Sequence, residues 1–216
     1  IPGLVAAGEC DHSQHGANRL GANSLLSAIY GGMVAGPKAV EYMNGLQKSS
    51  SDISSTVFDA YTKKEQQKYE DILKMDGSEN AYLLHRELGE WMTDNVTVVR
   101  YNDRLKKTDE KIQELMERWK NINVNDTQRW SNSAAQFTRH LWNMLILARV
   151  ITIGALLRNE SRGAHYKPEF PERDDQNFLK TTMAKFNPET LAPDIYYEDV
   201  DISLIPPRKR DYSKNK

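Results

Sequence analysis

The residues best suited to chemistry lie close together near the start of the chain. Glu9 follows a short apolar run, and a glycine-rich stretch then carries Arg19 before a helix is expected to begin at Asn23 or Ser24. A carboxylate directly after a strand is the usual group that holds ribose hydroxyls. The first amides of a helix favour negative charge, and a guanidinium can donate two parallel hydrogen bonds to a carboxylate. These features predict a nucleotide and anion site; the alternative is a glycine-rich turn with a surface arginine.

Composition narrows the class of protein. The 216 residues are 39% hydrophobic and 27% charged, which supports a buried core. The 29 basic and 30 acidic residues give a net charge of -1, which argues against a dedicated nucleic-acid-binding protein. The single cysteine, Cys10, excludes an internal disulfide and a multi-cysteine metal site, and His85 and His140 are isolated. We therefore predict a cytosolic chain with no metal site.

Three zones of the chain must position the candidate residues. Eight of the 12 glycines fall within the first 45 residues, and no proline occurs between residues 38 and 167. A long stretch without proline permits long helices. We expect a mainly α fold: a strand–loop–helix piece in residues 1–48, an up-down helical bundle in residues 49–160, and a tail with short strands in residues 161–216.

The expected elements follow from periodicity and from end signals. Residues 4–7 are typical of a buried strand, and such a strand needs a sheet to join, so we expect the chain to be a fragment of something larger. The first bundle helix should stop at Gly77, and its apolar stripe comprises Val57, Tyr61, Tyr69, Ile72 and Leu73. Two further helices should follow, the first beginning near Asn80 and the second carrying Leu105, Ile112, Leu115, Met116 and Trp119.

A fourth helix is expected from about Asp126 to Leu157, with Asp126 or Thr127 as its cap. Its second half is apolar almost all round, but Arg149 and two other polar residues interrupt it, which favours a bundle core over a membrane span. Arg162 and His165 follow, where cations can complement the end of the helix. Residues 178–186 and 194–202 alternate as short strands do.

Two motifs resemble one known family. Glu9 together with HGANRLGANSLL (residues 15–26) is similar to the flavin-proximal segment of the succinate dehydrogenase/fumarate reductase flavoprotein subunits. ESRGAH (residues 160–165), followed by ERDD (residues 172–175), resembles the tail motif of the same family. The two motifs occur in the order found in this family, on either side of a helical region of the size of the family's C-terminal helical domain. The sequence around the first motif is most similar to the Gram-positive bacterial type of succinate dehydrogenase.

The resemblance implies a role for each matching position. Glu9 would bind the ribose of FAD, and Arg19 would bind a carboxylate of the dicarboxylate substrate. Ser24 and Leu25 would contact the isoalloxazine ring through the start of the helix. His15 and Asn18 would lie just outside these contacts. We predict no catalytic residue and no metal ligand in this segment.

The resemblance also implies that the chain is the C-terminal portion of a larger enzyme. Residues 1–48 would complete an FAD-binding domain whose GxGxxG fingerprint, flavin-attaching histidine and substrate-capping domain lie outside this sequence. The parent reaction would oxidise succinate to fumarate with FAD and pass electrons to an iron–sulfur subunit, a membrane cytochrome b subunit and quinone. The parent would lie peripherally on the cytoplasmic side of the membrane, with no transmembrane segment in this chain. Alone, the chain should be inactive and should not retain FAD. Alternatives are an L-aspartate oxidase-like fragment and a non-catalytic helical interaction module.

Overall fold

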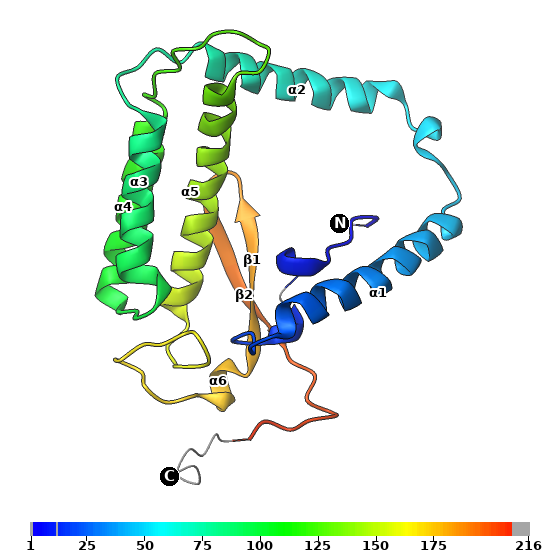
Figure 1. Ribbon diagram of the computed structural model, residues 1–216, viewed down its shortest axis with the longest axis vertical. Coiled ribbons are helices and arrows are strands. Elements are labelled where there is room, and N and C mark those ends of the chain that lie inside the picture. The colour runs from blue at the N-terminus through cyan, green and yellow to red at the C-terminus, as the bar shows by residue number, and fades with distance from the viewer. Residues whose placement is uncertain (1, 12, 209–216) are drawn as a thin grey trace.

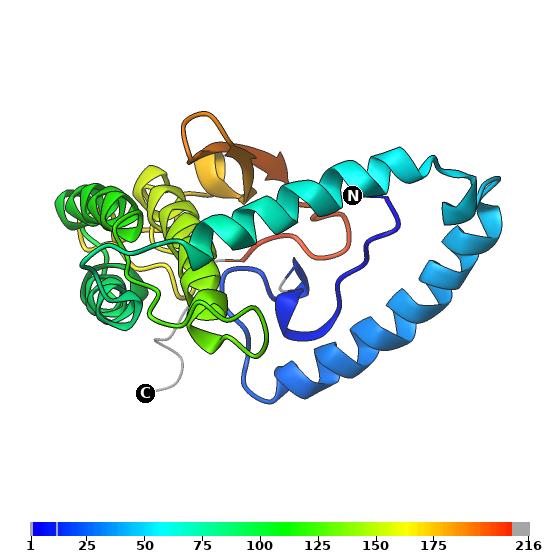
Figure 2. The same cartoon turned by 90° about the horizontal axis from the view of Figure 1, so that it is seen from above.

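The computed structural model describes residues 2–11 and 13–208. Three helices (Ala81–Met92, Asn102–Trp119 and Ser133–Leu157) lie side by side, and a fourth (Ser55–Leu73) extends away from one end of them. The helix Asn23–Gly45 lies on the opposite side of the molecule, so that the chain surrounds an open centre (Figures 1 and 2). The helices and strands are α1 (Asn23–Gly45), α2 (Ser55–Leu73), α3 (Ala81–Met92), α4 (Asn102–Trp119), α5 (Ser133–Leu157), α6 (Asp175–Phe178), β1 (Lys180–Asn187) and β2 (Ala192–Asp199). Short 3-10 turns occur at Gly8–Cys10, Ser13–His15 and Ser50–Asp52, and a π-helical turn, Thr93–Thr97, follows α3.

The hydrophobic core lies where α3, α4 and α5 pack together. The i, i+3, i+4, i+7 spacing predicted an apolar stripe on α4, and its Leu105, Ile112 and Leu115 are fully buried. Ile112 and Leu115 share one cluster with Leu141 and Leu145 of α5, which are also fully buried, whereas Leu105 packs in a second cluster with Val96 and Ala155. Burying a large aliphatic side chain stabilises the folded state by about 1.5–3 kcal/mol. These helices therefore form the stable part of the molecule, as predicted for a mainly helical chain.

α2 does not join this core along its length. Val57 and Tyr61 are exposed, and burial is confined to Ile72 and Leu73 at the C-terminal end of the helix. The predicted stripe is therefore confirmed at Tyr69, Ile72 and Leu73, which lie in or against the core. It is wrong at Val57 and Tyr61, because that part of the helix points away from the bundle towards α1 (Figure 1). The bundle consequently has three packed helices with α2 attached at one end.

The sequence predicted the start of α3 correctly and the start of α5 incorrectly. α3 begins at Ala81, next to the predicted start near Asn80, and Asn80 is its cap, since its side-chain oxygen accepts from the amide of Tyr82 at 2.9 Å. α5, however, begins at Ser133 and not near Asp126. Asn132 is its cap and accepts from the amide of Ala135 at 2.8 Å, whereas the Asp126 side chain closes a local turn earlier in the loop.

The predicted strand at residues 4–7 is absent. This segment is extended, pairs with no other strand and leads into the 3-10 turn Gly8–Cys10. A single strand is not stable without a partner, and residues 2–11 and 13–208 provide none for it. The opening part is therefore an extended segment, a loop and a helix.

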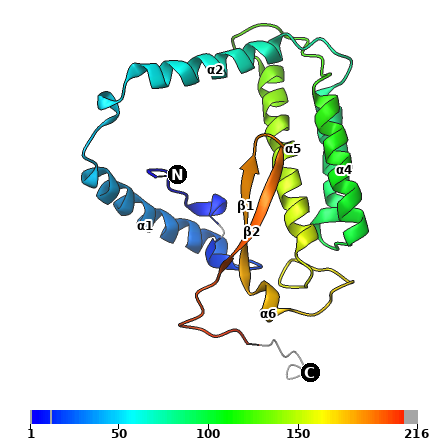
Figure 3. The ribbon, with the colours of Figure 1, turned by 180° about the vertical axis from the view of Figure 1, so that it is seen from behind.

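The tail forms the predicted pair of short strands. β1 and β2 pair antiparallel, with Lys180 opposite Asp199 and Asn187 opposite Ala192, and the hairpin packs against α5 (Figure 3). Residues 209–216 of the predicted tail lie outside the described residues. No observation bears on the domain boundaries at 48 and 160, which stay predictions.

In the described part of the chain, α5 is the one helix long and apolar enough to cross a membrane by length and composition. Central helices of soluble bundles share these properties. Arg149, which interrupts its apolar run, donates to both carboxylate oxygens of Asp109 on α4, at 2.8 and 3.1 Å, and to the carbonyl of Leu191. This arginine joins α5 to α4 and to the turn of the hairpin, which supports the interpretation of α5 as a bundle helix.

We predict that Asn132→Ala destabilises the chain by about 1–2 kcal/mol, because the amide of Ala135 loses its buried acceptor. Urea unfolding followed by tryptophan fluorescence measures the change. Asp126→Ala is the matched control and should cost less than about 0.5 kcal/mol, since it removes one exposed hydrogen bond. An equal loss in the two variants would contradict the assignment of Asn132 as the cap.

Candidate functional site

Glu9 lies on the 3-10 turn Gly8–Cys10, which packs against the second and third turns of α1. Gly31 of α1 lies beside the backbone of Gly8, where an added Cβ would make ordinary van der Waals contact with the Gly8 nitrogen at 3.6 Å. The carboxylate of Glu9 is exposed beside this contact. Seven residues separate Gly31 from Ser24, so the turn lies about 10 Å along the helix axis from the start of α1.

The start of α1 has free amide groups. Ala22, the residue before the helix, has φ 65° and makes no capping hydrogen bond through its side chain. The amides of Ser24 and Leu25 belong to the first turn, where no intrahelical acceptor exists. Both residues are exposed. This end of α1 can therefore donate hydrogen bonds to a negatively charged or electron-rich group.

His15 is attached to the same helical turn. Its Nε2 lies 3.1 Å from the hydroxyl oxygen of Ser27, and that hydroxyl donates to the carbonyl of Ser24 at 2.9 Å. Since the hydroxyl has one proton, Nε2 of His15 is the donor to Ser27. The imidazole thus holds the loop against the start of α1, whereas Asn18 is exposed.

Arg19 is exposed on the loop between His15 and α1. Its Nη1 donates weakly to the carbonyl of Leu20, at 3.4 Å. In the described ranges 2–11 and 13–208, no carboxylate forms an ion pair with this guanidinium. It can therefore bind a carboxylate supplied by a ligand.

The second motif, residues 160–175, is built around a buried carboxylate. Glu160 is fully buried, and its oxygens accept from Nε and Nη2 of Arg162 at 2.8 and 2.9 Å. Arg162 also donates to Asp175 at 2.7 Å. Burial lowers the pKa of Arg162, but its hydrogen bonds to Glu160 and Asp175 outweigh this effect, so that its pKa is raised. Arg162 is thus a structural cation paired within the tail.

His165 and Lys167 differ from what the sequence indicates. Nδ1 of His165 faces the guanidinium of Arg100, and Nε2 donates to the carbonyl of Arg158 at 2.9 Å. Burial, together with the neighbouring cations, lowers the pKa of His165 to about 4, so the ring is neutral at pH 7. His165 therefore contacts the end of α5, as the sequence indicated, but it does so as a neutral donor to the Arg158 carbonyl and not as a cation.

The cation at the end of α5 is Lys167, which the sequence analysis missed. Its fully buried Nζ donates to the carbonyl of Leu156 and to the side-chain oxygens of Asn102 and Asn159, at 2.7–3.1 Å. Burial lowers its pKa to about 8. The sequence contains no signal for this role, because Asn102 lies 65 residues away.

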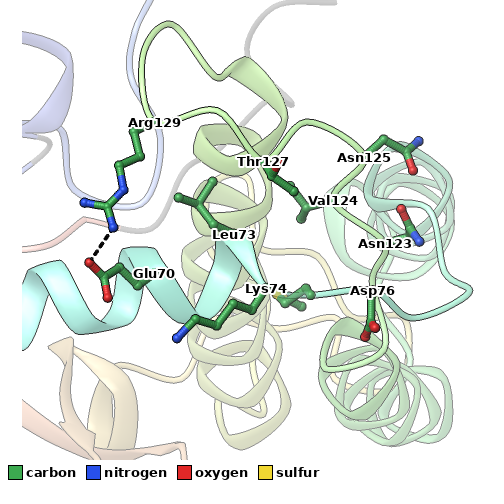
Figure 4. Close-up of a pocket in the computed structure, with 10 residues that line it drawn as sticks. Glu70, Leu73, Lys74, Asp76, Asn123, Val124, Asn125, Thr127 and Arg129 are labelled. Carbon is green, nitrogen blue, oxygen red and sulfur yellow. Dashed lines mark hydrogen bonds and ion pairs between the residues drawn. The ribbon is translucent and has the colours of Figure 1, made fainter.

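The two motifs meet directly. The amide of Ala164 donates to the carbonyl of Ala17 at 3.2 Å, two residues before Arg19. A surface hollow of about 650 Å³ lies elsewhere, between α2 and the loop before α5, where Arg129 pairs with Glu70 at 3.0 Å (Figure 4). No predicted site residue lines it. Among residues 2–11 and 13–208, no group of three or more His, Cys, Asp or Glu side chains is arranged to hold a metal ion.

An exposed glycine-rich loop, whose arginine forms no ion pair within the described residues, is attached to a three-helix bundle and a hairpin, and it is found in this chain together with a match to the C-terminal region of flavoprotein subunits. The family model "Fumarate reductase flavoprotein C-term" matches residues 85–212, and the chain belongs to this family.

Individual relatives agree with this assignment. The chain is 70% identical over all 216 residues to the succinate dehydrogenase flavoprotein subunit of Bacillus subtilis, covering 37% of that protein. It is 35% identical to the fumarate reductase flavoprotein subunit of Escherichia coli over 98% of the chain and 35% of that protein. The solved E. coli quinol fumarate reductase superimposes over 97% of this chain and 35% of its own, with a TM-score of 0.89 and 34% identity. The chain thus spans little more than a third of the relatives it matches.

We predict that lowering the pH from 6.5 to 4 removes about 3 kcal/mol of stability through His165 alone. The folded-state pKa of about 4 lies below the ordinary value of 6.5, so the unfolded chain binds a proton in this range while the folded chain does not. Urea unfolding at pH 6.5 and at pH 4 measures the loss. His165→Gln keeps a donor and an acceptor but does not titrate, so its free energy of unfolding should fall less between the two pH values. An equal fall in the wild-type chain and the variant would contradict the prediction.

Proposed function

We propose that this chain acts within a longer flavoprotein subunit that binds FAD and oxidises succinate to fumarate. The observation that carries the proposal is the exposed guanidinium of Arg19, free of ion pairs in the described residues and located beside the uncapped start of α1. The 70% identity to a succinate dehydrogenase flavoprotein subunit supports succinate as the substrate. We further propose that the iron–sulfur and cytochrome b subunits of such a complex receive the electrons on the cytoplasmic side of the membrane.

The residues present fit a flavin. The first-turn amides of Ser24 and Leu25 suit the electron-rich edge of an isoalloxazine ring, and exposed Glu9 lies on the turn that packs against α1, about 10 Å along the helix axis from its start. FAD, when bound, supplies the acceptor for the hydride of succinate. Glu9 accepts hydrogen bonds from ribose hydroxyls, and the start of α1 orients the ring.

Arg19 has two effects in this proposal. Its guanidinium holds a substrate carboxylate through two parallel hydrogen bonds, which fixes the orientation of the dicarboxylate. Its fixed positive charge also stabilises negative charge that develops near the flavin. His15 keeps the loop against α1 through Ser27 and needs no role in proton transfer. Asn18 lies in the same loop, beside Arg19.

In the full-length subunit, we predict that Arg19→Lys lowers kcat/KM for succinate by about 10²-fold or more, because lysine keeps the charge but loses the bidentate geometry. Steady-state kinetics with the flavin content measured in parallel tests this. The FAD content should change little. Glu9→Ala is the contrasting variant and should weaken FAD retention before it alters substrate binding. Near-normal succinate turnover by flavin-loaded Arg19→Lys would overturn the assignment of Arg19.

We predict that the 216-residue chain, purified alone, folds but does not retain FAD. Glu9, Ser24 and Leu25 are all exposed, so the described residues could contact a flavin only from one side. Circular dichroism should show a mainly helical protein, and flavin absorbance after gel filtration should be absent. Stoichiometric flavin in the purified chain would refute the prediction.

A further inference from the structure

We propose that Gly163 is a positioning residue for Arg19, because its bare backbone is the surface against which the loop before Arg19 packs. The catalytic part of this inference rests on the proposed function of Arg19. The structural part rests on the contact between the two motifs alone.

The contact allows no side chain at position 163. A Cβ built on Gly163 would lie 2.7 Å from the carbonyl oxygen of Ala17 and 2.8 Å from both its carbonyl carbon and its Cβ. Such distances are shorter than real Cβ contacts, and the main obstacle is backbone, which cannot rotate away. Gly163 also has φ +58°, which disfavours most L-residues independently. Position 163 therefore requires glycine for two independent reasons, the close contact with Ala17 and the positive φ.

The turn that carries Gly163 is firmly attached to the bundle. Arg162 and His165 exchange two backbone hydrogen bonds, at 2.8 and 3.0 Å, which close the turn. The Arg162 side chain pairs with buried Glu160, and His165 donates to the carbonyl of Arg158 at the end of α5. Arg162 and His165, the first and last residues of the turn, are thus both held by partly buried polar contacts.

The loop on the other side has few anchors of its own. α1 contains no buried residue, and Arg19 is exposed. Among the backbone hydrogen bonds of the described residues, the bond from Ala164 to Ala17 is the one that joins residues 2–48 to the tail motif. Ala17 precedes Arg19 by two residues, so a shift of Ala17 moves the guanidinium directly.

A methyl group at position 163 must displace Ala17. Misplacing a binding group by about 1 Å can cost about 10²-fold in rate, and a displaced Arg19 weakens binding of the substrate carboxylate. We expect Gly163→Ala to lower kcat/KM for succinate by roughly 10–100-fold, mainly through a higher KM. FAD content should stay unchanged, because Gly163 contacts none of the proposed flavin-binding residues.

The test uses the full-length subunit with two variants and one control. Gly163→Ala introduces both the Cβ and the backbone strain, whereas Gly163→Asn introduces the Cβ in a residue that tolerates positive φ. Ile112→Val, at a fully buried position in the core of the bundle, is the control for a general loss of stability. KM and kcat for succinate, flavin content, and hydrogen exchange of residues 16–22 by mass spectrometry are measured for each.

We expect faster exchange of residues 16–22 and a raised KM in both Gly163 variants, and neither effect in Ile112→Val. Recovery of normal KM and exchange in Gly163→Asn would overturn the inference, because strain and not the close contact would then explain the glycine. Unchanged exchange in Gly163→Ala would overturn it as well. If the wild-type subunit does not oxidise succinate, the proposed function fails and the catalytic part with it, whereas the exchange data still decide whether Gly163 holds the loop.

Discussion

The buried carboxylate of Glu160 organises the C-terminal third of the chain. A charge removed from water is tolerated only where it is paired and hydrogen-bonded, and Glu160 accepts from Arg162, from the amide of Asp174 at 2.9 Å, and lies 3.4 Å from Nε of Arg158. Arg158 in turn donates to two backbone carbonyls at the start of the hairpin, at 2.6 and 2.8 Å. One charge therefore joins the end of α5, the turn at Gly163, α6 and the hairpin.

The opening segment depends on this arrangement because it has no core of its own. α1 is 23 residues long without a buried side chain, and its apolar face is open at Leu25, Leu26, Ile29 and Met33. An exposed face of this kind is typical of a surface that packs against another one. Under the proposed function, that surface is the remainder of the flavin-binding domain. Within the described residues, the loop of Arg19 is oriented by the turn at Gly163 and by the bond between His15 and Ser27.

The sequence predicted those features that depend on local patterns. The stripe of α4 and the start of α3 near Asn80 follow from residues within a few positions of one another, and both are confirmed. The start of α5 was misplaced because Asp126 and Asn132 carry equally good capping side chains, and the choice depends on which one is buried. The strand at residues 4–7 and the stripe of α2 failed for a different reason, since each requires a packing partner that periodicity alone does not supply.

The candidate site and the motif beside it also contain residues that the sequence indicated and one that it did not. Glu9, Arg19, Ser24 and Leu25 were assigned from a motif, and the structure leaves all four accessible without testing their roles. The burial of Lys167 could not be predicted, because a lysine is buried only where acceptors from distant segments surround it.

The neutral state of His165 follows from its burial and from the charges around it. Burial lowers the pKa of His165 most, the hydrogen bond to the Arg158 carbonyl partly opposes this, and the charges of Arg100, Lys167 and Arg158 lower the pKa further. A protonated imidazole could no longer accept from Arg100 and would add a positive charge to a cluster in which Lys167 has only neutral acceptors. The neutral ring instead accepts from Arg100 and donates to the end of α5. The turn that carries Gly163 therefore keeps its position because one of its corners is an uncharged histidine and the other is an arginine paired with Glu160.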